Sequence, residues 1–185
     1  MADRIAVLDD GQIVQCDRPE SLLAKPCTVG VAKAIGVWPM QWLRASVREK
    51  KLQFESSSVR CLMDIDLPDG DFELGFRPED VHLQPIAFAS NGGVRRQDAK
   101  SMSGAAIQQD GTITDCRQLE SNLHLRIKSG ETTFLAVVNA SFSERQWSAG
   151  QPIGIGQPIG VQIPLATLHC FDQDSGCRID FGQTP

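Results

Sequence analysis

From Trp42 onward the sequence is a succession of short apolar or alternating runs, each ended by Gly, Pro, Asp or Asn. Alternation with a period of two is the pattern of a half-buried strand, and many short strands between turn residues are typical of sandwiches and small barrels. The pattern therefore predicts a mainly β fold. We expect strands near 42–48, 51–54, 72–76, 80–84, 105–117, 123–128, 132–138, 159–163 and 167–171.

Helix signals are confined to the start of the chain. In the stretch Asp17 to Glu20, the Asp can accept from the backbone N–H three residues on, and Pro19 suits a first helical turn. This predicts a short helix from Pro19 to Lys25. A second helix is expected from Thr28 to Ile35, where apolar residues recur at helical spacing.

The opening run, Ile5 to Asp10, has two interpretations. It resembles the acidic strand that binds magnesium in an ATPase, or it is one arm of a hairpin that turns at Asp10-Gly11. A nucleotide site also needs the loop G-x-x-x-x-G-K-[ST], whose backbone N–H groups hold the phosphates, and the chain contains no Gly-Lys dipeptide. Asp-Gly between apolar runs is a strong hairpin signal. We therefore predict a hairpin and no nucleotide cofactor.

Charge and hydropathy exclude two classes of partner. The formal net charge is -5, whereas a protein that binds a phosphate backbone normally shows a basic face. No run approaches the ~18 apolar residues of a membrane span. We expect a soluble protein that does not bind nucleic acid.

Metal and nucleophilic chemistry are also disfavoured. The six cysteines contain no C-x-x-C pair, and no signal peptide precedes them, so reduced thiols in a cytosolic protein are expected. His82, His124 and His169 have no second ligand at metal-binding spacing. There is no G-x-S-x-G nucleophile motif. The sequence predicts no metal site and no catalytic residues.

Four segments carry a resemblance to a known family. They are residues 1–13 (MADRIAVLDDGQI) with Arg18-Pro19-Glu20, residues 31–40, residues 74–80 (LGFRPED) and residues 171–179 (FDQDSGCRI). In this order they resemble the end of the nucleotide-binding domain and the regulatory domain of ATP-binding cassette (ABC) importers of the sugar and glycerol-phosphate type. The chain departs from the family in lacking its switch histidine and its signature loop.

The resemblance implies a domain organisation. Residues 1–36 would be the terminal hairpin and helices of a nucleotide-binding domain. Residues 37–185 would be a transport-associated OB (TOBE) domain of small OB-like barrels, in two β halves (37–86 and 105–181) joined by a mobile linker, 87–104. The implied function is regulation and dimerisation of an importer ATPase without catalysis by this chain. The alternative is a free-standing OB module that binds a small oxyanion or sugar at a dimer interface.

The resemblance also implies partners and a location. The expected partners are a second copy of the chain, ABC transporter subunits at the inner face of the cell membrane, and a regulatory protein or small ligand. The motif residues singled out are Gly75, Arg77, Pro78, Glu79, Phe171, Asp172, Gly176 and Arg178. Arg77 and Glu79 can pair across a turn at Pro78. These residues form either a structural corner or a regulatory or dimer contact.

A tandem hexapeptide, Gly150 to Ile155 followed by Gly156 to Val161, stands before the last predicted strands. A proline cannot donate to a β ladder, so each copy can only begin a strand or lie at an edge. We expect the second copy to begin the strand and the first to form an exposed loop.

Overall fold

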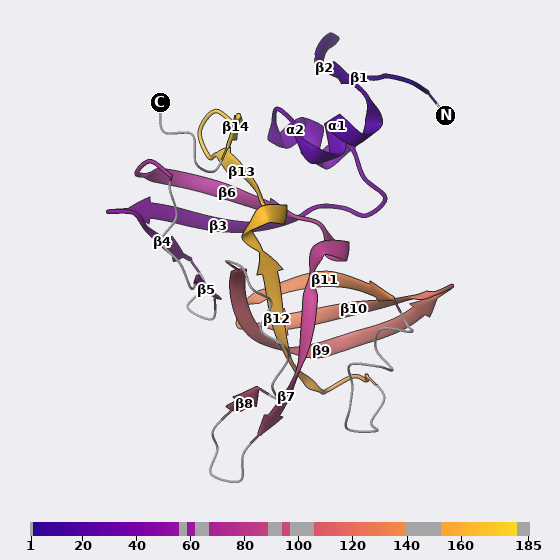
Figure 1. Ribbon diagram of the computed structural model, residues 1–185, viewed down its shortest axis with the longest axis vertical. Coiled ribbons are helices and arrows are strands. Elements are labelled where there is room, and N and C mark those ends of the chain that lie inside the picture. Colours follow the sequence, from indigo (N-terminus) through magenta and orange to yellow (C-terminus); the bar gives the residue numbers. More distant parts are fainter. Residues whose placement is uncertain are drawn as a thin grey trace. The chain divides into compact units, whose positions relative to one another are not determined.

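The computed structural model describes residues 2–55, 59–61, 67–88, 94–96, 106–139 and 153–180, and it divides into two compact units (Figure 1). Unit 1 consists of Met1–Gln53, Asp64–Arg77 and Leu168–Pro185. Unit 2 consists of Phe54–Met63 and Pro78–Thr167. Among the described residues, no helix has the length and apolar character needed to cross a membrane.

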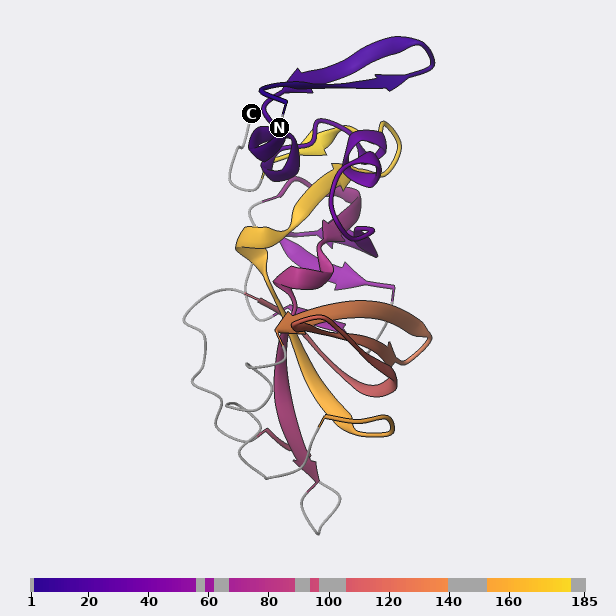
Figure 2. The same ribbon diagram turned by 90° about the vertical axis from the view of Figure 1, so that its right-hand side faces the viewer.

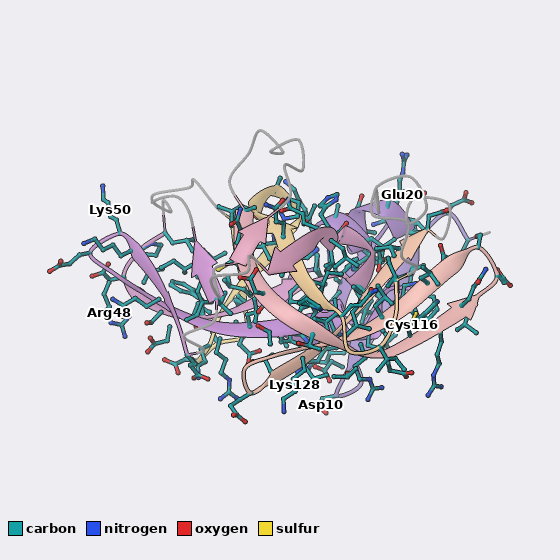
Figure 3. The ribbon with its side chains drawn as sticks, turned by 90° about the horizontal axis from the view of Figure 1, so that it is seen from below. Asp10, Glu20, Arg48, Lys50, Cys116 and Lys128 are labelled. Atoms are coloured by element: carbon teal, nitrogen blue, oxygen red, sulfur yellow. The ribbon has the colours of Figure 1, made fainter. Side chains whose placement is uncertain are left out.

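Unit 1 is built on a five-stranded sheet with the order β14-β13-β6-β3-β4. The central strand, β6, pairs antiparallel with both β3 and β13, and its Phe72, Leu74 and Phe76 are buried. A tight turn with Glu49 and Lys50 at positive φ joins β3 to β4, and Figure 3 shows Lys50 projecting from it. The strand bounds are β3 Gln41–Arg48, β4 Lys51–Phe54, β6 Gly70–Phe76, β13 His169–Asp172 and β14 Arg178–Ile179.

The start of the chain forms the predicted hairpin, β1 (Ile5–Asp9) paired with β2 (Gln12–Asp17). Its two turn residues, Asp10 and Gly11, have φ of 46° and 76°, the left-handed values that such a turn requires. Figure 2 shows this hairpin as an extended ribbon. The hairpin interpretation of the opening run is therefore confirmed.

Two short helices follow, α1 (Pro19–Ala24) and α2 (Val29–Ala34), close to the predicted bounds. The expected cap on α1 is wrong. Asp17 accepts from the N–H of Arg18 at 2.7 Å, and the N-cap residue is Arg18, which makes no side-chain cap. On α2 the Thr28 side chain does cap the helix, because it accepts from the N–H of Val31 at 3.3 Å.

Unit 2 is a second sheet with the order β11-β10-β9-β12-β7-β8, to which β5 adds by pairing with β9. Its core consists mainly of aliphatic side chains on alternate positions, such as Ile107, Ile127 and Val161. The bounds are β5 Val59–Cys61, η1 Pro78–Asp80, β7 His82–Phe88, β8 Val94–Arg96, β9 Ala106–Leu119, β10 Asn122–Ser129, β11 Thr132–Asn139, β12 Pro158–Pro164 and η2 Leu165–Thr167.

The mainly β class, with a hairpin and two short helices before the sheets, is confirmed. The division into halves 37–86 and 105–181 differs from the observed units. The chain end returns to the first sheet, where β13 pairs with β6, while β7 pairs with β12 in the second. Non-local pairing of this kind leaves no mark on local sequence. Within the expected linker, 87–88 and 94–96 belong to strands, and 89–93 and 97–104 lie outside the described residues.

Candidate functional site

Arg77, the residue after β6, is turned into unit 1 and is only 7% exposed. Its guanidinium donates to the carbonyl of Ile35 at 3.1 Å and to that of Leu23 at 3.4 Å. These carbonyls lie at the C-terminal ends of α2 and α1, where helix carbonyls have no partner within the helix. One buried arginine therefore caps both helices and ties them to the sheet.

Arg77 was expected to pair with Glu79, but its partners in unit 1 are backbone carbonyls. Glu79 is exposed in η1, and the guanidinium goes to backbone carbonyls instead. A partly negative helix end inside the unit satisfies a buried cation without a carboxylate. Gly36 makes room for it, because a Cβ there would overlap the Arg77 guanidinium.

Gly75 and Phe171 belong to the contact between helices and sheet. A Cβ on Gly75 would lie 2.5 Å from the Met40 sulfur, so only glycine lets Met40 and Trp42 approach the strand. Phe171 is fully buried against Ala32 and Met40, and its ring lies 5.7 Å from that of Trp42. These motif residues are packing residues of unit 1.

Asp172 and Gly176 shape a tight turn between β13 and β14. The Asp172 carboxylate accepts from the N–H and hydroxyl of Ser175 at 2.7 and 2.6 Å, and these bonds lower the pKa of Asp172. Gly176 has a φ of 65°, and its carbonyl accepts from the N–H of Val29 at 3.0 Å. The turn thereby holds the start of α2, where Thr28 also forms a bridge with Cys177.

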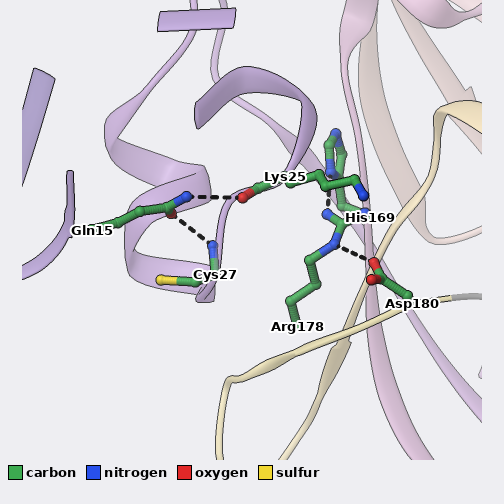
Figure 4. Close-up of polar contacts among 6 residues, drawn as sticks. All are labelled: Gln15, Lys25, Cys27, His169, Arg178 and Asp180. Atoms are coloured by element: carbon green, nitrogen blue, oxygen red, sulfur yellow. Dashed lines mark hydrogen bonds and ion pairs between the residues drawn. The ribbon is translucent and has the colours of Figure 1, made fainter. Parts of the chain in front are cut away.

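Arg178 organises a second polar contact, drawn in Figure 4. Its Nε donates to the Asp180 carboxylate at 2.7 Å, and one terminal nitrogen lies 2.9 Å from Nδ1 of His169. Arginine has only donors, so Nδ1 must accept and the neutral ring carries its proton on Nε2. Burial first, and then the charges of Arg178 and Arg77, lower the pKa of His169 to about 4.

Lys25, at the end of α1, completes this region. Its carbonyl accepts from the Gln15 side chain at 3.0 Å, and Gln15 also accepts from the N–H of Cys27 at 2.9 Å (Figure 4). The positive charge of Lys25 contributes to lowering the pKa of Asp180, after the larger effect of Arg178. We call Lys25, Arg77, His169, Arg178 and Asp180 the junction cluster.

The structure brings most of the predicted motif residues together in unit 1. Gly75, Arg77, Phe171, Asp172, Gly176 and Arg178 all act where the helices meet the sheet, whereas Pro78 and Glu79 belong to unit 2. Sequence reasoning missed Lys25, His169 and Asp180, which share no motif spacing. It considered His169 only as a metal ligand, and the structure shows that His169 is buried at the start of β13. Within the described residues, no group of three or more His, Cys, Asp or Glu is placed to hold a metal ion.

Comparison with known proteins identifies relatives along almost the whole chain. The sn-glycerol-3-phosphate import ATP-binding protein UgpC of Vibrio vulnificus is 28% identical over 175 residues, which are 94% of this chain and 40% of that protein. UgpC of Psychromonas ingrahamii is 30% identical over 97% of this chain and 43% of its own length. The chain is a relative of the ATP-binding subunits of ABC importers. The xylose/arabinose import ATP-binding protein XacJ of Haloferax volcanii is 27% identical over 97% of this chain and 44% of its own.

Two further findings complete the comparison. No family model matches the chain. Among solved structures, the cytoplasmic molybdate-binding protein ModG with molybdate bound covers 70% of this chain and 94% of its own, at 11% identity and a TM-score of 0.43. The chain spans about two fifths of the length of the curated relatives it matches.

Proposed function

We propose that this chain is the regulatory portion of an ABC importer ATP-binding subunit of the sugar or glycerol-phosphate type, and that it has no nucleotide site of its own. One observation supports this most directly. Arg77 and the turn at Gly176 fasten the hairpin-and-helix segment to the five-stranded sheet, and both belong to the same compact unit. Whatever binds the hairpin is thereby coupled to the sheet.

The hairpin offers a surface for such a partner. Leu8 and Ile13 are paired across the two strands, lie on one face and are each 64% exposed. A lone two-stranded ribbon is marginal in water, so this face gains stability when it is covered. We propose that it is covered by the nucleotide-binding portion of an importer subunit, which supplies the ATP site, at the cytoplasmic face of the membrane.

The test mixes the chain with a separately produced nucleotide-binding portion of a UgpC-type subunit. We expect the two to bind, with a Kd that Leu8→Asp raises at least about tenfold, the effect of ~1.4 kcal/mol. Ile155→Asp is the matched control, because Ile155 is 68% exposed but belongs to unit 2. Absence of binding, or equal losses with both variants, would refute the proposed docking.

Regulation and self-association need separate readouts. Adding the chain should change the ATPase rate of the nucleotide-binding portion, while the chain alone should show no nucleotide binding by calorimetry. We also propose that two copies associate, which sedimentation at high micromolar concentration checks. ATP hydrolysis by the chain alone would contradict the proposal that the nucleotide-binding portion supplies the ATP site and that this chain only regulates it.

A further inference from the structure

The junction cluster carries more positive than negative charge. Three of its five side chains are basic, and Asp180 is its single carboxylate, in a chain whose net charge is -5. Arg77 is occupied by two helix carbonyls. Lys25, at the end of α1, is exposed, and its charge still acts on Asp180.

Asp180 occupies the part of Arg178 that binds oxyanions best. A guanidinium presents parallel N–H groups that match carboxylate and phosphate oxygens. The Nε of Arg178 donates to Asp180 at 2.7 Å, and its side chain is 17% exposed while that of Asp180 is 39% exposed. The carboxylate is therefore the solvent-facing member of the pair, and turning it away would open the Nε edge of the arginine to solvent.

The other partner of Arg178 keeps the guanidinium in place when Asp180 leaves. His169 is buried at the start of β13, and its Nδ1 accepts from a terminal nitrogen of Arg178 at 2.9 Å. The backbone N–H of Arg178 is also fixed, by the carbonyl of Cys27 at 2.9 Å. The arginine is thus oriented from two sides that do not involve Asp180.

We propose that the junction cluster binds a small oxyanion of the phosphate type, and that Asp180 is a built-in competitor that occupies the site when no ligand is present. The ligand accepts from the Nε edge of Arg178 and from the ammonium of Lys25, while Arg77 adds charge from within unit 1. Asp180 swings toward solvent as the ligand enters. Since no bond is made or broken, binding is governed by charge and competition alone.

The site lies where α1, β13 and β14 meet, so its occupancy has a consequence for unit 1. Lys25 ends the helix that Arg77 caps, and Arg178 pairs with Phe171, which packs under α2. An oxyanion that bridges Lys25 and Arg178 ties α1 to the last strand. Ligand binding should therefore raise the stability of unit 1 and leave unit 2 unchanged.

The test measures binding of inorganic phosphate to the full chain and to three variants. Asp180→Asn removes the competing charge and keeps the side-chain shape. The Coulomb energy of two unit charges about 4 Å apart in water corresponds to about fivefold in affinity, and we expect at least that gain. Lys25→Gln in the Asp180→Asn background should lose most of the gain. Calorimetry and the imidazole resonances of His169 give two independent readouts.

Asp71→Asn is the matched control. Arg48 and Asp71 form an arginine–aspartate pair of 2.8 Å in the same unit, without a histidine behind the arginine. This variant should not gain phosphate affinity. A gain equal to that of Asp180→Asn would mean that net charge alone attracts the anion, and would overturn the proposal.

The unmodified chain supplies a test that requires no variant to fold. Bound phosphate should raise the pKa of His169, because a phosphate dianion carries more negative charge than the Asp180 carboxylate that it displaces and so favours the charged ring. The resonances of His82 and His124 should not move. Glycerol 3-phosphate in place of inorganic phosphate separates a phosphate-ester ligand from the free ion. If neither anion moves His169 in the unmodified chain or in Asp180→Asn, the site does not exist. These readouts are independent of docking at the hairpin.

Discussion

Unit 1 and unit 2 are both antiparallel sheets, but they are stabilised in different ways. In unit 1 charged and polar side chains reach backbone groups across long sequence separations, as Arg77 and Gln15 do. Unit 2 relies on ladders between long strands over an aliphatic core, with β9 paired to β10, β12 and β5. The comparison predicts that unit 1 responds to charge and pH, while unit 2 responds to core volume and polarity.

Among the substitutions that test this difference between the units, we expect Arg77→Met to have the largest effect on the stability of unit 1. Methionine keeps the aliphatic stem but leaves the carbonyls of Leu23 and Ile35 without a donor. Hydrogen bonds from a charged donor contribute about 1.5–3 kcal/mol each, so the loss of two should destabilise unit 1 by roughly 3–6 kcal/mol. Hydrogen exchange resolved by segment reports the loss in unit 1 and its absence in unit 2.

The control for Arg77→Met is Arg48→Met. Arg48, labelled in Figure 3, forms an exposed pair with Asp71. Such pairs contribute at most about 1 kcal/mol. Equal losses from the two substitutions would contradict the interpretation of Arg77 as a cap shared by two helices.

The next effect is the pH dependence of unit 1. The pKa of His169 is about 4 when folded and about 6.5 when unfolded, so between these values the unfolded chain binds the extra proton. The free energy of unfolding of unit 1 should therefore fall as the pH is lowered from 6.5 to 4, by roughly 2–3 kcal/mol. Asp172 and Asp180, whose pKa values are lowered, add a further loss only below about 3.8.

Two substitutions separate His169 from the other titrating groups. His169→Gln keeps an acceptor for Arg178. In this variant the free energy of unfolding of unit 1 should change little between pH 6.5 and 4. His82→Gln, in unit 2, should leave it unchanged. Chemical denaturation at a series of pH values measures both, and a profile that survives His169→Gln would show that another group titrates.

The sequence predicted local structure well because local residues determine it. Alternation located the main strands, and Asp10-Gly11 fixed the hairpin turn. It did not predict that β13 returns to β6, or that Arg77 turns to two helix ends 42 and 54 residues away. Those outcomes depend on which surfaces are left to bury after the strands form, and no local pattern encodes them.

A smaller effect is expected in unit 2, from Gln109→Met. Gln109 is 1% exposed on the core face of β9, between Val59 and Val161, and neither polar atom of its amide has a hydrogen-bond partner among the residues that the structure describes. An unsatisfied buried amide costs about 1–3 kcal/mol. Methionine has a similar shape without that cost, so unit 2 should gain roughly 1–2 kcal/mol.

Gln118→Met is the control for this gain, because Gln118 lies on the same strand and is exposed. It should change the free energy of unfolding of unit 2 by less than about 0.5 kcal/mol. If Gln109→Met destabilises unit 2, the amide contributes to the core in a way that an apolar side chain cannot replace.

The smallest effect is expected from shortening the tandem hexapeptide. As predicted, β12 begins in the second copy, at Pro158, which pairs with Thr112 of β9. The described part of the first copy makes a turn before it, in which Gly154 donates to the Gln157 side chain at 2.9 Å and Ile155 is exposed. The bonds that join Gly156 and Gln157 to Ile113 come from the second copy.

Deleting Gly150 to Ile155 should therefore leave β12 in place and change the free energy of unfolding of unit 2 by less than about 1 kcal/mol. Deleting Gly156 to Val161 instead gives a chain that differs from the first variant at one position, where Ile replaces the buried Val161. The remaining copy must then slide by six residues, an even number, so every side chain keeps its face of the sheet. One added methylene in a packed core costs about 1–3 kcal/mol, so the second variant should be the less stable of the two. Loss of cooperative unfolding in the first variant would show that both copies are structural.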